Sequence, residues 1–438
     1  MLPAFAEAAS VVQQIPQEIT HAIESDDEPS PTAPSNTSLA GFSYLVDVLS
    51  RAEGARPQRR AAARPPGEEA DGDEDPIAQA MSLANEGRFS ESMALCARHR
   101  PHWLATANVE RLGQCDFLIL RGHQSSGRAR DAVEAGFRAL NWFEFFDQPP
   151  TRLYTCGLLA LALACVGDAP KAFEILNVGK RLLPAMEAGS LYTALFFSYS
   201  GSTLWACGQL PEAAAAFEQS LQHLDSAKEP TRHRIVMQNL LSTRLQLAFE
   251  QPDGFDHAQV HEMLVTYREY AERDRAAGHL VSLARNAQFI GDAYWQLGQL
   301  EDARVALLGG IQAAEAAKSG PDRGMLLWRL ARLDRLQNNH RSASTALALS
   351  IELLEQSQQL RELAAAHLEA AALHEARLHW HAAVASLREH LRIRDRVQKS
   401  EVEARMYSLR VQLDVAQEGA AFKETLGHPR PMRNTPQS

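Results

Sequence analysis

Apolar residues along most of the chain recur at the spacing of an amphipathic helix. From Pro76 onward they stand at positions i, i+3, i+4 and i+7, while Gly and Pro become sparse. Alternating runs of Val, Ile and Thr, which are typical of strands, do not occur in this part of the sequence. The pattern therefore predicts an all-α chain from residue 76 onward.

The first 75 residues have a different composition. Pro, Ser, Thr and Ala dominate, and only Leu39–Leu49 has the pattern of a short amphipathic helix. A basic run between Arg51 and Arg64 is followed by an acidic run that ends at Asp75. Because such a segment buries too little apolar surface to offset its conformational entropy, we expect residues 1–75 to form a disordered leader. Its charged runs are typical of a solvated tail, with a short partner-binding motif as the alternative.

A turn residue followed five positions later by a small residue recurs eight times. The eight pairs are Gly87 and Ser92, Gly127 and Ala132, Gly167 and Ala172, Gly208 and Ala213, Asp253 and Ala258, Gly298 and Ala303, Asn338 and Ala343, and Leu378 and Ala383. Gly, Asn and Asp adopt the left-handed conformation that ends a helix, and the small residue lets the next helix approach closely. Leu378 adopts that conformation least readily. The recurrence predicts eight helical hairpins.

Most of the predicted hairpins share two further positions, with Leu120 and Gln246 as exceptions at the first and His123, Asp334 and His374 at the second. Seven residues before the turn stands a small residue, such as Gly201 or Gly291, where we expect two first helices to touch. Four residues before the turn stands a larger residue, such as Tyr294, and Arg285–Ala303 contains every one of these positions. This pattern resembles the tetratricopeptide repeat over about residues 76–397. The resemblance implies a right-handed superhelical α-solenoid of about eight hairpins whose concave groove binds a partner protein or peptide.

The last predicted helix continues beyond the final repeat. Val384–Gln417 contains no Gly or Pro, and five apolar residues within it are spaced 4, 3, 4 and 3 apart. They are Val402, Met406, Leu409, Leu413 and Ala416. This spacing is a coiled-coil seam about two heptads long, in which Arg405 would face Arg410 of a parallel partner. We expect a helical extension over residues 398–418 that allows weak self-association, followed by a disordered tail over residues 419–438.

The same segment carries a second resemblance. Leu387–Gln417 resembles the helix that joins a tetratricopeptide sensor array to a C-terminal diguanylate cyclase domain in bacterial signalling proteins. The cyclase signature G-G-[DE]-E-F does not occur in the sequence, since Gly309-Gly310 is followed by Ile311-Gln312. The resemblance therefore implies a sensor or scaffold in bacterial signal transduction and not a cyclase.

Charge and cysteine content limit the classes of function. Lys and Arg number 44 against 54 Asp and Glu, a formal net charge of −10, which disfavours direct nucleic-acid binding. The one local exception is Arg388–Arg410, with seven basic and four acidic residues. The five cysteines form no C-x-x-C pair and lie in apolar stretches, so we expect buried free thiols. The start of the chain has no signal-peptide pattern, and we expect a cytoplasmic protein.

Two stretches of the chain carry no charged residue and are candidates for membrane spans. They are Leu153–Gly167 and Ala188–Pro211. The second contains several Ser and Thr residues and has no flanking asymmetry of Lys and Arg. We therefore expect no membrane span and interpret both as helices buried by their neighbours.

The sequence contains no pattern that points to catalysis or to a cofactor. His374 and His379 are five positions apart, whereas the two histidines of a zincin helix are four apart. The glycine-rich phosphate loops and the G-x-S-x-G elbow do not occur. We therefore expect a non-enzyme without a bound metal or cofactor.

The groove of a helical-hairpin array is lined by first-helix residues thirteen, ten, six and three positions before each turn. Trp and Arg at these positions are typical interface anchors, and Arg can bind a carboxylate through two hydrogen bonds. The predicted groove residues are Phe117, Arg121, Tyr154, Trp205, Arg285, Asp292, Trp295, Trp328, Arg332 and Arg335. The alternative is that the tryptophans fill gaps between successive helices.

These observations favour a non-catalytic scaffold or sensor that binds a partner protein or peptide. Three alternatives stay open. They are a regulator of transcription built on the same array, a ligand-sensing remnant of a diguanylate cyclase, and an enzyme whose site is assembled from dispersed residues.

Overall fold

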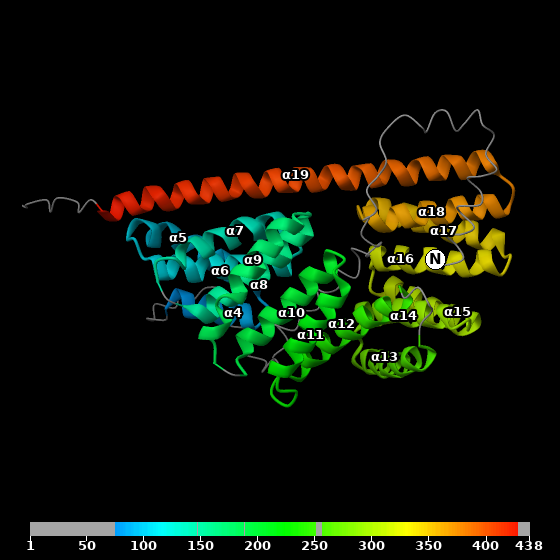
Figure 1. Ribbon diagram of the computed structural model, residues 1–438, viewed down its shortest axis with the longest axis horizontal. Helices are drawn as coiled ribbons and strands as arrows, with labels where there is room; N and C mark the ends of the chain where they lie inside the picture. The colour runs from blue at the N-terminus through cyan, green and yellow to red at the C-terminus, as the bar shows by residue number, and fades with distance from the viewer. Residues whose placement is uncertain (1–74, 147, 188, 251–255, 428–438) are drawn as a thin grey trace, which may run out of the picture.

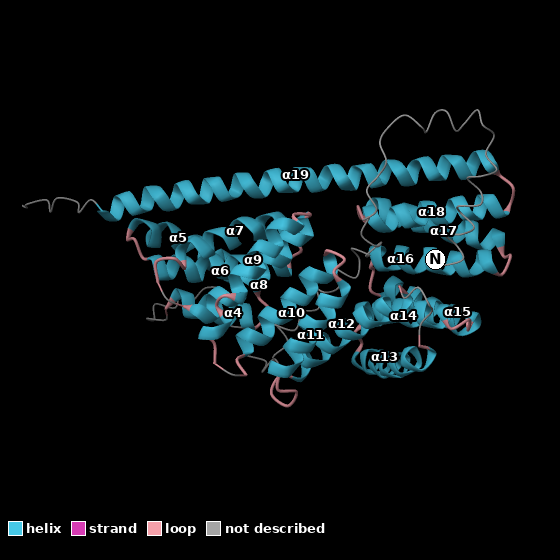
Figure 2. Ribbon diagram, viewed as in Figure 1, coloured by secondary structure: helices cyan, strands magenta, loops and turns pink. Residues whose placement is uncertain are grey.

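The structure is a computed structural model that describes residues 75–146, 148–187, 189–250 and 256–427 (Figure 1). All but one residue of the predicted leader, and the end of the predicted tail, lie outside these ranges. Within the described residues there are 16 α-helices and no strand (Figure 2). The predicted all-α fold is confirmed.

The helices form eight consecutive hairpins. In chain order they are α4 (Pro76–Asn85) with α5 (Phe89–Ala105), α6 (Val109–Ser125) with α7 (Ala129–Trp142), α8 (Pro149–Val166) with α9 (Ala169–Lys180), α10 (Leu191–Ala206) with α11 (Leu210–His223), α12 (Pro230–Phe249) with α13 (His257–Ala277), α14 (Leu280–Gln296) with α15 (Leu300–Ala316), α16 (Gly320–Leu336) with α17 (His340–Gln356), and α18 (Leu360–Ala376) with α19 (Trp380–Gly427). A short 3-10 helix, Leu183–Ala185, follows α9. Stacked side by side, these hairpins form an α-solenoid with a long C-terminal helix (Figure 1).

Seven of the eight predicted turn residues have the expected backbone conformation. Their φ angles lie between 58° for Leu378 and 100° for Gly167. Leu378 thus takes the left-handed conformation in spite of its side chain, at a cost of about 1–2 kcal/mol. The eighth turn residue, Asp253, lies outside the described residues.

The register predicted for the fifth hairpin is wrong by two residues. Ala258, expected to be the small buried residue, is exposed, and Val260 is fully buried instead. The reason is a longer loop between α12 and α13, after which Asp256 caps α13 by accepting a hydrogen bond from the Ala258 backbone N–H at 2.8 Å.

The small position seven residues before the turn also has a different neighbour from the one predicted. A Cβ atom at Gly291 would lie 2.6 Å from Leu307 Cδ2, and one at Gly201 would lie 2.7 Å from the ring of Phe217. Leu307 and Phe217 belong to the second helix of the same hairpin. These glycines therefore allow close packing within a hairpin and not between two first helices.

Helix α19 begins as the second helix of the last hairpin and then returns over the first hairpins (Figure 1). Ile393 packs in the core of α16 and α18, whereas Val411 and Val415 pack in the core of the N-terminal hairpins. Near its middle, Glu401 lies against Gly167 and pairs with Arg361 of α18 at 3.3 Å. One helix therefore joins both ends of the array.

This arrangement corrects two expectations about the C-terminus. The helix does not end at residue 418 but continues to Gly427, so the predicted tail over 419–438 is helical in its first part. The extension over residues 398–418 is docked on the array through one face, which the sequence analysis did not predict.

The two uncharged stretches form α8 and α10 in the interior of the array. Helix α8 alone among the described helices is long and apolar enough to cross a membrane, and 67% of that segment is buried against other helices. Such burial is typical of a core helix.

Candidate functional site

Charged side chains connect the first helices of the last three hairpins. Four arginines and four carboxylates, here called the ion-pair ladder, extend over α14, α16 and α18. They are Arg285, Asp292, Asp322, Arg329, Arg332, Arg335, Glu362 and Glu369. The four positive and four negative formal charges balance, so the ladder as a whole is neutral.

The shortest contacts of the ladder run from one first helix to the next. Arg285 pairs with Asp322 at 2.8 Å, and Arg335 pairs with Glu369 at 2.5 Å. Partners in the ladder are separated by about one repeat, as are Arg335 and Glu369, 34 positions apart. These pairs could therefore have been predicted from the sequence by looking for an arginine and a carboxylate about one repeat apart.

Arg332 occupies the centre of the ladder. Its guanidinium lies 3.6 Å from the ring centroid of Trp295 and 5.4 Å from that of Trp328. It donates a hydrogen bond to Asp292 at 3.1 Å, while its Nε is buried without a hydrogen-bond partner. Burial lowers the pKa of Arg332 and Asp292 opposes this, and an arginine stays protonated at neutral pH. The arrangement is a cation–π stack that uses both tryptophans.

Trp328 is held by polar contacts as well as by stacking. Its indole Nε1 donates a hydrogen bond to Glu362 at 3.2 Å. The guanidinium of Arg329 lies 4.3 Å from its ring centroid. Because Arg329 and Glu362 are themselves buried, the ring of Trp328 covers charged groups as well as filling space.

The ten predicted groove residues fall into two sets by exposure. Five are buried, namely Phe117, Arg121, Tyr154, Trp205 and Arg285. The other five are partly exposed, namely Asp292, Trp295, Trp328, Arg332 and Arg335. The partly exposed set lies together on α14 and α16, and we call it the Trp-Arg surface.

The buried residues of the N-terminal half form a separate cluster. The Tyr154 ring lies 5.4 Å from that of Phe117 and 5.7 Å from that of Tyr199. Arg121 donates to Asn85 of the preceding first helix at 3.3 Å. Tyr192, which the repeat pattern did not predict as a groove residue, contacts Tyr154 and is 39% exposed. The structure therefore does not bring all ten predicted residues into one site.

The cysteines lie in apolar surroundings that affect their ionisation. The five cysteines are free thiols, but only Cys96, Cys115 and Cys156 are buried, so the expectation that all five are buried is wrong for Cys165 and Cys207, which are partly exposed. Burial raises the pKa of Cys156 and of Cys207 to about 12, which keeps both thiols protonated at neutral pH. Within the same part of the chain no three His, Cys, Asp or Glu side chains are grouped to hold a metal ion.

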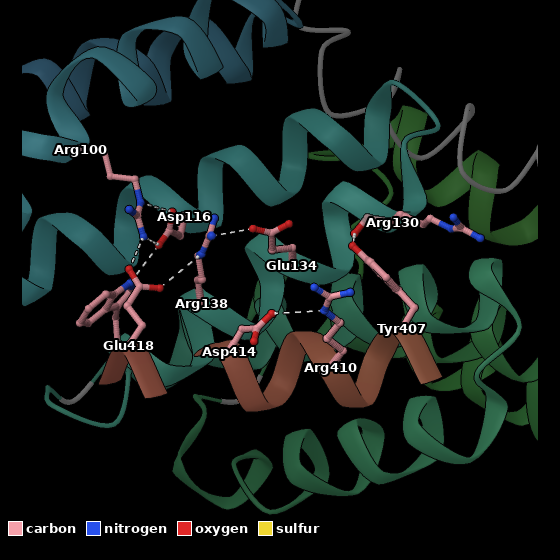
Figure 3. A network of polar contacts seen from close by, with 10 residues as sticks. Arg100, Asp116, Arg130, Glu134, Arg138, Tyr407, Arg410, Asp414 and Glu418 are labelled. Atoms are coloured by element: carbon pink, nitrogen blue, oxygen red, sulfur yellow. Dashed lines mark hydrogen bonds and ion pairs between the residues drawn. The ribbon is translucent and has the colours of Figure 1, made fainter. Parts of the chain in front are cut away.

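A second polar network fastens α19 to the first hairpins (Figure 3). Asp116 is fully buried, where it accepts hydrogen bonds from Arg100 at 3.0 Å and from the Trp142 indole at 2.9 Å. Burial raises the pKa of Asp116, and the positive charge of Arg100 opposes this. Glu418 of α19 completes the network by pairing with Arg100 at 3.3 Å and Arg138 at 3.5 Å.

Aromatic contacts support the same docked position of α19. The Tyr407 hydroxyl donates a hydrogen bond to the Arg130 carbonyl at 3.0 Å. The Phe422 ring packs edge-on against Trp142, with 5.1 Å between ring centroids. Tyr407 and Arg130 are 277 positions apart, so no local sequence pattern predicts such contacts.

Comparison with known proteins gives a likeness in fold only. No protein-family model matches the chain, and no curated protein matches its sequence. The apo form of RapI matches with a TM-score of 0.52 and 11% identity, covering 74% of this chain and 98% of RapI. Aspartyl phosphate phosphatase F from Bacillus subtilis matches with a TM-score of 0.51 and 11% identity, covering 84% and 96%. The chain thus has a tetratricopeptide-like helical repeat fold.

Proposed function

We propose that the chain is a non-catalytic cytoplasmic scaffold or sensor in bacterial signal transduction, and that the Trp-Arg surface binds its partner protein or peptide. The observation that carries the proposal is the Arg332 guanidinium in cation–π contact with both Trp295 and Trp328 on a partly exposed face. Trp and Arg contribute most to binding where they are fixed in place before the partner arrives. The helical-repeat fold, which presents extended surfaces for binding, supports the same function.

The balanced charges of the ladder define the partner that fits. A carboxylate of the partner reaches Arg335 only by competing with Glu369, which is already paired with it. A basic group of the partner can at the same time pair with the released carboxylate. A peptide segment with both charges and an apolar or aromatic side chain therefore fits better than a strongly acidic one.

The test is capture of partners by the full chain from a lysate of the cells that produce it, followed by affinity measurement for Arg335→Ala. The matched control is Arg304→Ala on the second helix α15. The two arginines are 23% and 22% exposed, and each pairs with a carboxylate of a neighbouring hairpin. We expect Arg335→Ala to weaken partner binding about tenfold or more, and Arg304→Ala to leave it unchanged.

Two results would contradict the proposal. Equal binding by both variants would place the partner elsewhere on the array. Recovery of DNA, or turnover of a metabolite without a protein partner, would favour the transcription regulator or the dispersed-site enzyme instead.

A further inference from the structure

Helix α19 has apolar residues on two opposite sides. The docked side is formed by buried residues that include Ala404, Val411, Val415 and Phe422. The opposite side is formed by Val402, Met406, Leu409 and Leu413, here called the outer stripe, which are 55% to 66% exposed. At about 100° per residue the outer stripe lies diametrically opposite the docked side. The contacts that hold α19 on the array therefore leave the outer stripe free of it.

The spacing of the outer stripe specifies the kind of surface that fits it. Intervals of 4, 3 and 4 residues place these side chains at successive d and a positions of a heptad, which pack into a helix with the same spacing. A helix docked on one face is ordinarily polar on the other. We propose that the outer stripe pairs with the outer stripe of a second copy of this chain, and that the two helices run antiparallel.

The direction of pairing follows from the flanking charges. In a parallel pair, Arg405 of each copy lies opposite Arg410 of the other, which places like charges together twice. In an antiparallel pair, Val402 lies opposite Leu413 and Met406 opposite Leu409 of the second copy. The same register places Glu403 opposite Arg410 of the second copy, twice by symmetry.

The fold accommodates such a pair. Helix α19 runs along one edge of the described array, and the other described helices all lie on one side of it (Figure 1). Two copies joined through their outer stripes would therefore hold their arrays on opposite sides of the helix pair. Asp395 and Gln398 interrupt the apolar surface toward Leu391 and confine the pairing to the C-terminal part of the helix. The contact from Val402 to Leu413 is about 16 Å long, which predicts a weak, concentration-dependent dimer.

Sedimentation equilibrium of the full chain over a wide concentration range tests the pairing. We expect a dimer whose association constant falls about tenfold or more in Leu409→Glu. Val305→Glu is the control, because Val305 of α15 is also an exposed apolar residue, at 69% against 55% for Leu409, but lies outside the outer stripe. A chain that is monomeric at all concentrations overturns the proposal. That result favours a segment of the same chain, such as Leu39–Leu49, as the element that covers the outer stripe. A dimer that withstands Leu409→Glu overturns it as well.

Charge variants test the direction of the pair. We expect Glu403→Arg and Arg410→Glu each to weaken self-association, and an equimolar mixture of the two variants to restore it, because every facing pair is then complementary. A parallel pair predicts the reverse for Arg410→Glu, which would remove the repulsion from Arg405. Stronger or unchanged association of Arg410→Glu would therefore overturn the antiparallel assignment.

Discussion

Glu418 of α19 pairs with Arg100 of α5 at 3.3 Å, across 318 positions of sequence. Arg100 belongs to the first hairpin and α19 to the last, so this contact joins the two ends of the array. A hairpin in an open solenoid is stabilised only by its immediate neighbours. Here the first hairpins have an additional neighbour, and their stability depends on the C-terminal helix.

Phe422→Ala should weaken the docking of α19 on the first hairpins. Phe422 is buried and packs against Trp142 and Phe145, and removing a buried aromatic ring costs about 3–5 kcal/mol. We expect faster hydrogen exchange in α7 and in α19 beyond residue 404, with α14 to α17 unchanged. Leu391→Ala is the control on the same helix, because Leu391 is 60% exposed and its loss should cost less than about 0.5 kcal/mol. Equal exchange in the two variants would mean that Phe422 does not hold α19 in place.

Two glycines of one hairpin should respond oppositely to alanine. A Cβ at Gly291 would lie 2.6 Å from Leu307 Cδ2, so in Gly291→Ala the buried Leu307 side chain or the helices must shift, at a cost of about 1–3 kcal/mol. A Cβ at Gly309 in α15 meets no atom within 4 Å. Gly309→Ala should therefore stabilise the helix by about 0.5–1 kcal/mol. Chemical denaturation of both variants measures the difference, and a Gly291→Ala variant as stable as Gly309→Ala would contradict the close packing.

The sequence predicted the hairpins well because backbone conformation at the turns is tied to particular residues. Gly167 and Asn338 both have positive φ. Leu378 was predicted as a turn residue only because it stands one repeat after Asn338, and it also has positive φ. The fifth hairpin was misplaced because a longer loop changes the register without changing the apolar pattern. A loop length is set by how the two helices must meet, and this is a property of packing.

The candidate site was harder to predict than the fold. Position along the first helix selected ten residues, of which five are buried, and it did not show that Asp292 neutralises Arg332 from the neighbouring hairpin. The docking of α19 was missed for a related reason. The outer stripe of α19 has the stronger heptad pattern, while the docked face mixes Val411 and Val415 with small residues such as Ala404 and Ser408, which weakens its apolar pattern.

Mild acid should destabilise the array through three partly buried histidines. Burial lowers the pKa of His123, His367 and His374, because it disfavours the charged imidazolium. In the unfolded chain these side chains bind protons near pH 6.5, before the folded chain does, so stability is complete above that pH and falls as the pH drops below it. We expect the thermal midpoint of a variant with Gln at all three positions to fall less between pH 7 and pH 5. An identical fall in both proteins would assign the acid sensitivity to other groups.

Two substitutions of Trp328 distinguish the contribution of packing from the contribution of hydrogen bonding in the ion-pair ladder. Trp328→Ala removes the ring that covers Arg329 and also the hydrogen bond to Glu362, so we expect a loss of about 3–5 kcal/mol in the free energy of unfolding. Trp328→Phe keeps much of the ring but leaves Glu362 without its indole donor, which should cost about 1–3 kcal/mol.

Chemical denaturation of the two variants shows whether Trp328 stabilises the array by packing, by its hydrogen bond to Glu362, or by neither. If Trp328→Phe is as stable as the parent protein, the hydrogen bond to Glu362 contributes nothing and the ring acts by packing alone. If Trp328→Ala is also tolerated, the tryptophan is not a structural part of the array, and its place beside Arg332 is then explained by partner binding only.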